Sequence, residues 1–136
     1  MSLIDDIKKH EGFSSVVYQC TAGYDTIGYG QRITYLKVTK NQAEEWLIEE
    51  LDNLEIRLCD KFDWFVSSPK KVQDIVMNMC YQLGVSSFSK FKKTIYLLAH
   101  KDYRAASTEM LDSKWARDDT PRRAKELSDR LKNVKR

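Results

Sequence analysis

The sequence predicts an α+β protein, with a small sheet near its start and helices over the rest of its 136 residues. β-branched and aromatic runs between glycine-containing turns occupy residues 14–35, which is typical of a small antiparallel sheet. From residue 39 onward, apolar residues recur at helical spacing instead. The length suits a single domain, with one sizeable core or with two small lobes that share a connecting helix.

The first expected element is a short helix over residues 3–11. Ile4 and Ile7 fall on one face of this helix, and Gly12 marks its end. The sheet follows directly, and its three expected strands are residues 16–18, 24–27 and 31–35.

A long helix is expected after the sheet. Thr39 and Gln42 have the spacing of a capping box, which is typical of a helix start. An apolar stripe then continues for about five turns, as far as Leu58. A helix of this length, between a sheet and a second group of helices, would connect two lobes.

The second half predicts four more helices. Ser68 and Pro69 indicate the first, as N-cap and first-turn proline, and Gly84 ends it. Thr120 and Pro121 open the last one. The apolar residues that mark these helices are, in order, Val72, Ile75, Val76, Met79, Cys80 and Leu83; Phe88, Phe91, Ile95 and Leu98; Tyr103, Ala106, Met110 and Leu111; and Ala124, Leu127 and Leu131.

Composition narrows the class of protein. No apolar run is long enough to span a bilayer, and the first residues are acidic where a secretory signal is basic, so we expect neither membrane insertion nor a signal peptide.

The spacing of Cys20, Cys59 and Cys80 is not that of metal ligands and favours reduced thiols, and we expect the last two to be buried helix residues. Residues 1–60 hold 6 Lys and Arg against 11 Asp and Glu, whereas residues 61–136 hold 17 against 9. The basic half is either a solvated helix surface or a surface for an anionic polymer.

The most informative pattern is a lone carboxylate beside a glycine-rich hairpin. Glu11 ends the first helix, and Cys20 and Thr26 lie in the hairpin. A carboxylic acid that faces small nucleophilic or water-binding side chains is what protonation of a glycosidic oxygen beside a bound water requires. To keep its proton near neutral pH, the acid must have its pKa raised from about 4.3 toward roughly 6 by desolvation in a cleft. The pattern therefore predicts a cell-wall glycosidase.

The chain resembles the phage-type lysozymes, the endolysins of the T-even lysozyme family, over nearly its whole length. Taken singly the shared residues are weak signals, but their order and spacing together are strong. They are Glu11-Gly12, Tyr18, Thr21, Gly23-Tyr24, Thr26-Ile27-Gly28 and Gly30 in the N-terminal part, and Asn78-Met79, Tyr81-Gln82, Gly84, Phe91, Ser113, Trp115, Thr120-Pro121 and Arg123-Ala124 in the C-terminal part.

The resemblance implies a lysozyme-like fold within a single domain. We expect an N-terminal lobe of about residues 12–58 and a helical lobe of about residues 61–136, with the helix of residues 3–11 packed against the helical lobe. A cleft between the lobes would hold a glycan strand.

The resemblance also implies hydrolysis of the β-1,4 bond between N-acetylmuramic acid and N-acetylglucosamine in peptidoglycan, with inversion at the anomeric carbon. Glu11 would donate the proton, and Cys20 and Thr26 would hold the attacking water. Arg123 would orient the carboxyl of Glu11. Substrate-binding positions would be Gly30, Tyr81, Gln82 and Phe91, although Phe91 and Trp115 also fit core positions because both fall in apolar helical patterns.

Two positions depart from the family pattern. Cys20 stands where aspartate is commoner, and Gln31 stands where many relatives have histidine. A neutral thiol is a poor general base at pH 7, so a thiolate fraction or direct nucleophilic attack would have to replace the carboxylate. Two rival functions stay open: a lytic transglycosylase, in which Glu11 acts as acid and then base, and a non-catalytic peptidoglycan-binding virion module.

The resemblance further implies lysis of a host bacterium by a phage or prophage product. Such a protein would wait in the host cytoplasm until a holin-type membrane pore admits it to the periplasm and cell wall. We expect its partner to be peptidoglycan glycan strands, with no nucleic acid, and the protein to be a monomer. His10 and His100 lack metal-type spacing, and the reaction needs no cofactor.

Overall fold

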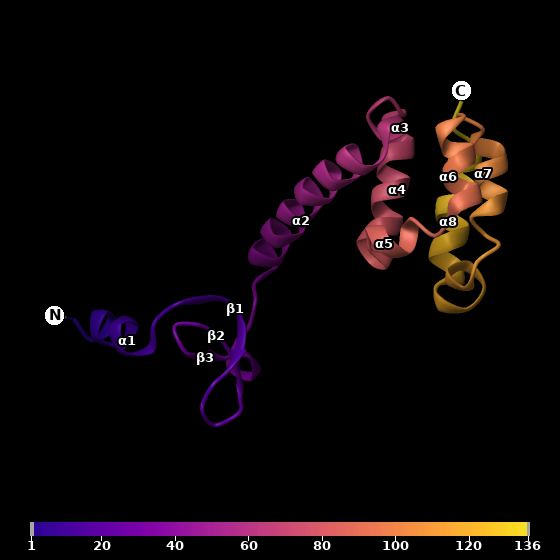
Figure 1. The fold of residues 1–136 in the computed structure, drawn as a ribbon. Helices are drawn as coiled ribbons and strands as arrows, with labels where there is room; N and C mark the ends of the chain where they lie inside the picture. Colours follow the sequence, from indigo (N-terminus) through magenta and orange to yellow (C-terminus); the bar gives the residue numbers. More distant parts are fainter. Residues whose placement is uncertain (1, 136) are drawn as a thin grey trace. The chain divides into compact units, whose positions relative to one another are not determined.

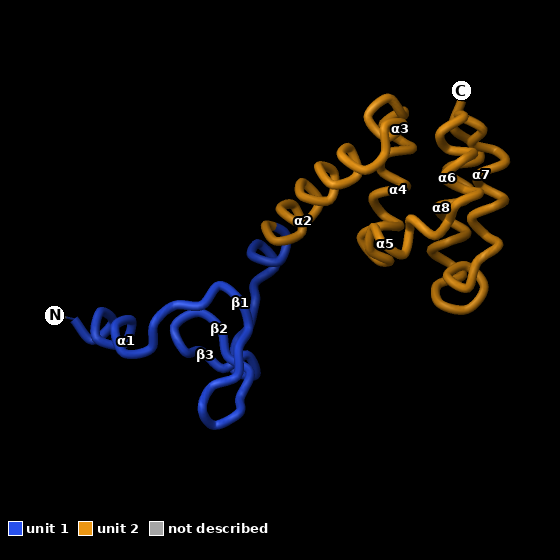
Figure 2. The backbone as a smooth tube through the Cα atoms, viewed as in Figure 1, with its two compact units in different colours: residues 1–44 blue, residues 45–136 orange. Residues whose placement is uncertain are grey.

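The computed structural model describes residues 2–135, which form one three-stranded sheet and a series of helices (Figure 1). The chain divides into two compact units: unit 1 is Met1–Glu44 and unit 2 is Glu45–Arg136 (Figure 2). Unit 1 holds the sheet and unit 2 is helical, so the α+β class is confirmed. The packing of residues 3–11 against the helical lobe stays a prediction.

Unit 1 begins with α1, Leu3–Glu11, as predicted. The Ser2 hydroxyl accepts a hydrogen bond from the backbone N–H of Asp5 at 3.2 Å and caps the helix start. The helix ends at Gly12, where φ is 69° and the N–H donates to the carbonyl of Lys8 at 2.9 Å. Glu11 is therefore fixed as the last residue of the helix, directly before the sheet.

The sheet is antiparallel, with its strands in the order β1-β2-β3. In the two ladders, Thr26 of the middle strand lies opposite Tyr18 on one side and Arg32 on the other. The register of the first ladder shifts between Ser14 and Tyr18. The strands are β1, Ser14–Gln19; β2, Asp25–Gly28; and β3, Gln31–Arg32.

The third strand is shorter than the sequence predicted. Residues Ile33–Tyr35, expected to continue the strand, form a 3-10 turn instead. The N–H of Leu36 donates to the carbonyl of Ile33 at 3.0 Å, and this local bond replaces the ladder. The strand prediction is therefore wrong for these three residues.

The long helix is α2, Lys40–Lys61. Its capping box is confirmed, because Thr39 N–H donates to Gln42 Oε1 at 2.9 Å and Gln42 N–H donates to Thr39 Oγ1 at 3.1 Å. The apolar stripe is exposed over the first turns, and Leu54 and Leu58 become buried near the end, within unit 2.

Unit 2 departs from the expected helices in three ways. The short α3 was not predicted. Ser68 does not cap the next helix, because its hydroxyl donates to the carbonyl of Trp64 at 2.7 Å and Pro69 takes the cap position. The helix expected around Phe88 and Phe91 is two helices. The elements are α3, Asp63–Val66; α4, Lys70–Leu83; α5, Val85–Phe88; α6, Lys92–Ala99; α7, Tyr103–Glu109; a π-helical turn, Trp115–Asp119; and α8, Pro121–Lys132.

The hydrophobic core lies in unit 2. Phe65, Phe88 and Leu58 are fully buried in it. Cys80 is buried, as predicted, whereas Cys59 is only half-buried. The remaining buried apolar residues are Leu54, Val72, Ile75, Val76, Met79, Val85, Leu98, Tyr103, Ala106, Met110, Trp115, Ala116, Ala124, Leu127 and Leu131. Across residues 2–135, no helix is long and apolar enough to cross a membrane.

The core position of Leu58 gives a test of the packing. We expect Leu58→Ala to lower the free energy of unfolding by about 2–5 kcal/mol, because it leaves a cavity in a fully buried site. Ile56→Ala, on the same helix but 60% exposed, should cost less than about 1 kcal/mol. Urea denaturation followed by circular dichroism measures both, and equal losses would contradict the assigned core face of α2.

Candidate active site

The carboxyl group of Glu11 lies against the turn between β2 and β3. A Cβ atom placed on Gly30 would lie 2.5 Å from Oε2 and 2.8 Å from Cδ of Glu11, far closer than carbon and oxygen tolerate. Gly30 also has φ of 76°, which disfavours other residues. The predicted acid and the predicted substrate-binding glycine are therefore in direct contact.

Further contacts hold α1 and the β2–β3 turn together. The ammonium of Lys8 lies 5.3 Å from the centre of the Tyr29 ring, and the Phe13 ring lies 5.4 Å from it. Gln31 shapes the turn, because its Oε1 accepts the N–H of Tyr29 at 2.8 Å. Gln31 thus has a local structural role at the position where many members of the resembled family have histidine.

Cys20 and Thr26 share one backbone acceptor, the carbonyl of Tyr24. Cys20 N–H donates to it at 3.0 Å and Thr26 Oγ1 donates to it at 2.7 Å. Thr26 is 2% exposed and Cys20 is half-buried. Because Thr26 donates its proton to this carbonyl, its lone pairs remain to accept a hydrogen bond from another group.

The environment of Cys20 favours its thiolate. Hydrogen bonding from the backbone of Tyr24, and then of Ala22, lowers the pKa of the Cys20 thiol; partial burial opposes this, and Thr26 and Arg32 add smaller lowering effects. A lowered pKa increases the fraction of thiolate near neutral pH, which is the form that can act as a base or nucleophile.

Unit 1 does not bury its acid. The Glu11 side chain is exposed, although its carboxyl is packed on Gly30. The sheltered position expected from the sequence is therefore not provided by unit 1 itself. The local geometry does bring Glu11 to the β2–β3 turn of the sheet in which β2 holds Thr26 and the β1–β2 turn holds Cys20.

In unit 2, Arg123 is anchored on α4. Its Nε donates to Asn78 Oδ1 at 2.8 Å and its Nη2 donates to the backbone carbonyl of Asn78 at 3.1 Å. Its Nη1 has no hydrogen bond to the residues that the structure describes. The orientation of Glu11 by Arg123 stays a prediction.

The other expected binding residues of unit 2 differ in their surroundings. Trp115 Nε1 donates to Gln82 Oε1 at 2.9 Å, and Gln82 Nε2 donates to Thr120 Oγ1 at 3.3 Å, so the Gln82 amide is held in one orientation. Tyr81 is exposed. Phe91 is half-buried, with its ring 6.2 Å from that of Trp115, so it belongs at least in part to the aromatic core.

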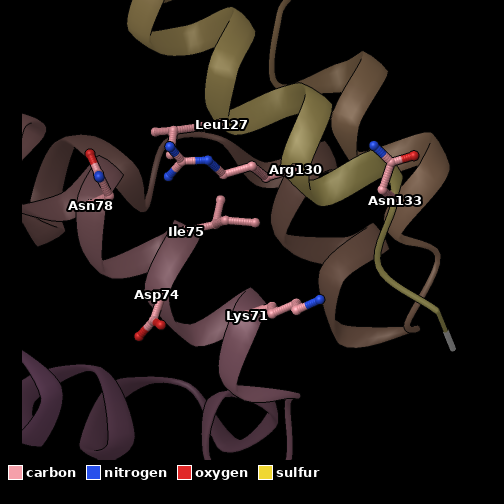
Figure 3. Close-up of a pocket in the computed structure, with 7 residues that line it drawn as sticks. All are labelled: Lys71, Asp74, Ile75, Asn78, Leu127, Arg130 and Asn133. Carbon is pink, nitrogen blue, oxygen red and sulfur yellow. The ribbon is translucent and has the colours of Figure 1, made fainter.

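A pocket of about 440 Å³ in unit 2 contains none of the predicted site residues. It lies between α4 and α8, and Figure 3 shows Arg130 extending across it toward Asn78. Its other lining residues are Lys71, Asp74, Ile75, Leu127 and Asn133. Within residues 2–135, no group of three or more His, Cys, Asp or Glu is arranged to hold a metal ion.

Two residues near the site were given no role from the sequence: Tyr24, quoted only as a residue shared with the family, and Arg32, which was not singled out at all. The Arg32 guanidinium lies 3.8 Å from the centre of the Tyr24 ring and 5.9 Å from that of Tyr35. The hairpin register was the available signal, since a turn over residues 28–30 places Arg32 opposite Thr26.

Comparison with known proteins identifies the family of the chain. The family model described as Phage lysozyme matches residues 8–133, and the chain belongs to the phage lysozyme family. Probable T4-type lysozyme 2 of Dictyostelium discoideum is 29% identical over 154 aligned residues, covering 90% of this chain and 89% of the relative. An Endolysin of Acyrthosiphon pisum secondary endosymbiont phage 1 is 28% identical over 114 residues, covering 82% of this chain and 75% of the relative. The protein is accordingly a lysozyme, a glycoside hydrolase whose substrate is peptidoglycan.

The contact between Gly30 and Glu11 can be tested with a second glycine as control. Gly30→Ala and Gly84→Ala both place a side chain at positive φ, and each should cost about 1–2 kcal/mol of stability. Only Gly30→Ala displaces the Glu11 carboxyl, because the space beside Gly84 is open. We expect Gly30→Ala to lower the rate of peptidoglycan hydrolysis about a hundredfold and Gly84→Ala to retain it. Equal rates in the two variants would contradict the contact.

The thiols give a second test. Burial raises the pKa of Cys80 to about 12, whereas the pKa of Cys20 is lowered. Because the thiolate is the reactive form, we expect iodoacetamide near neutral pH to modify Cys20 in the folded protein and to leave Cys80 intact until urea unfolds the chain. Peptide mapping by mass spectrometry measures this order, and modification of Cys80 before Cys20 would contradict it.

Proposed function

We propose that this lysozyme hydrolyses the β-1,4 bond between N-acetylmuramic acid and N-acetylglucosamine. The observation that supports this most strongly is the contact of the Glu11 carboxyl with Gly30 in the β2–β3 turn, because Thr26 lies in β2 of the same sheet and Cys20 lies at the turn between β1 and β2. An acid and a pair of water-binding groups are thereby presented by one small unit, as hydrolysis of a glycosidic bond requires.

In this proposal, Glu11 protonates the glycosidic oxygen as the bond breaks. A sugar ring that binds over the exposed Glu11 excludes water from the carboxyl, and loss of water favours the form of a carboxylic acid that can donate a proton. Thr26 and Cys20 hold the attacking water, with the Cys20 thiolate accepting its proton. Attack from the face opposite the leaving group gives inversion at the anomeric carbon.

The thiol at position 20 also favours a second candidate, the lytic transglycosylase reaction. Without a second carboxylate, Glu11 could act as acid and then as base while a hydroxyl of the muramic acid closes an anhydro ring. The products separate the two reactions, because hydrolysis leaves reducing ends and transglycosylation leaves 1,6-anhydro ends. Mass spectrometry of digested peptidoglycan distinguishes them.

We further propose that the protein acts in host-cell lysis. The support is the similarity to a phage protein named Endolysin. The protein would be held in the host cytoplasm as a monomer until a holin-type pore lets it reach the periplasm and the cell wall. A turbidity assay with and without permeabilised inner membranes tests this dependence on a pore.

The roles of the catalytic residues have distinct expected outcomes. Glu11→Gln should lower release of reducing sugar at least about a hundredfold, because it removes the proton donor, with little change in unfolding free energy. Cys20→Ala should lower the rate severely and Cys20→Asp should retain it, since a carboxylate can also accept the proton of water. Glu49→Gln, an exposed glutamate of α2, is the matched control and should retain full activity. Wild-type activity in Glu11→Gln would refute the assignment.

A further inference from the structure

Arg32 is a half-buried cation that has no acidic partner among residues 2–135. It ends β3, opposite Thr26 of β2. Within residues 2–135 its guanidinium forms no ion pair, and its charge lies on the faces of Tyr24 and Tyr35. A guanidinium only 3.8 Å from a ring centre is a close stacking contact, and arginine keeps its charge at every pH that the protein meets.

The ring that Arg32 covers belongs to the residue on which Cys20 and Thr26 depend. The Tyr24 carbonyl accepts both Cys20 N–H and Thr26 Oγ1. A further bond, from Gly23 N–H to the Cys20 carbonyl at 2.8 Å, closes the turn between the strands. Fixing the Tyr24 side chain from β3 therefore restrains the turn that sets the positions of the thiol and the hydroxyl.

The charge of Arg32 acts in the same place. Its positive charge lowers the pKa of the Cys20 thiol, in addition to the larger effects of the Tyr24 and Ala22 backbone. The other ionisable groups of the hairpin are the exposed Asp25 carboxylate and the phenols of Tyr18 and Tyr24. Arg32 is thus the cation of this hairpin that favours a negative charge at Cys20.

We propose that Arg32 is a positioning residue for the reaction: by stacking on the Tyr24 ring it braces the turn that holds Cys20 and Thr26. This inference rests on the proposed role of Cys20. It also bears on the absence of aspartate at position 20, because backbone hydrogen bonds and a cation in the same sheet favour the negative charge that a carboxylate has without help.

The test measures the thiol and the reaction separately. In a Cys59→Ser background, the alkylation rate of Cys20 by iodoacetamide is followed against pH in the parent protein and in Arg32→Gln, Arg32→Lys and Lys37→Gln. Lys37 is an exposed cation of the same unit and serves as the charge control. Circular dichroism checks that each variant folds. Arg32→Lys keeps the positive charge and removes the guanidinium, so it separates the effect of the charge from the effect of the stacking on Tyr24.

We expect Arg32→Gln to be alkylated about two to three times more slowly at pH 7, since removing one nearby cation disfavours the thiolate. Its rate of peptidoglycan hydrolysis should begin to rise at a higher pH than the rate of the parent protein does. Arg32→Lys should restore the alkylation profile at least in part, and Lys37→Gln should match the parent in both assays.

Two results would overturn the inference. Identical alkylation profiles in Arg32→Gln and the parent would show that Arg32 does not act on the thiol. A shifted alkylation profile with an unchanged pH profile of hydrolysis would show that the thiol does not serve the reaction, which overturns the positioning role. Failure of the proposed function would be seen in a different experiment, as full hydrolytic activity of the Glu11→Gln variant.

Discussion

The proposed active site of this lysozyme depends on one close approach, that of the Glu11 carboxyl to the backbone of Gly30. The approach requires a position without a side chain, in a turn whose positive φ also favours glycine. It requires equally that α1 end at Glu11, which the Gly12 cap ensures. A helix end and a hairpin turn are thereby joined at the carboxyl that we propose as the proton donor, without a large hydrophobic core in unit 1.

The second half of the site is organised by a backbone carbonyl. The Tyr24 carbonyl accepts hydrogen bonds from the Cys20 backbone N–H and from the Thr26 hydroxyl, so the two residues proposed to handle water are held at the same peptide group. Backbone hydrogen bonds are also the largest cause of the lowered pKa of Cys20. A short hairpin can therefore position a thiol and adjust its ionisation together, with Arg32 adding charge from the neighbouring strand.

Unit 2 supplies the stable core and two long-range polar pairs. Arg123 bonds to Asn78, and Gln82 bonds to Trp115; in each pair, residues of the C-terminal segment bond to α4. Side chains that are already bonded within the protein lose less conformational freedom on binding a ligand than free ones do. The same bonds make Gln82 and Trp115 part of the structure of unit 2, whatever contact Gln82 makes with substrate.

The sequence by itself determined the elements with strong local signals. The helix of residues 3–11, the capping box of Thr39 and Gln42, the ends at Gly12 and Gly84, and the core face of α4 are each set by neighbouring residues, and each was predictable. The tertiary structure alone decided what depends on residues distant in sequence or competing for a bond. It ended β3 at Arg32, turned Ser68 from a cap into a donor to Trp64, split the helix around Phe91, and placed Arg32 on Tyr24. Local propensity does not specify which partner a side chain meets, because that choice is made by packing and strand register.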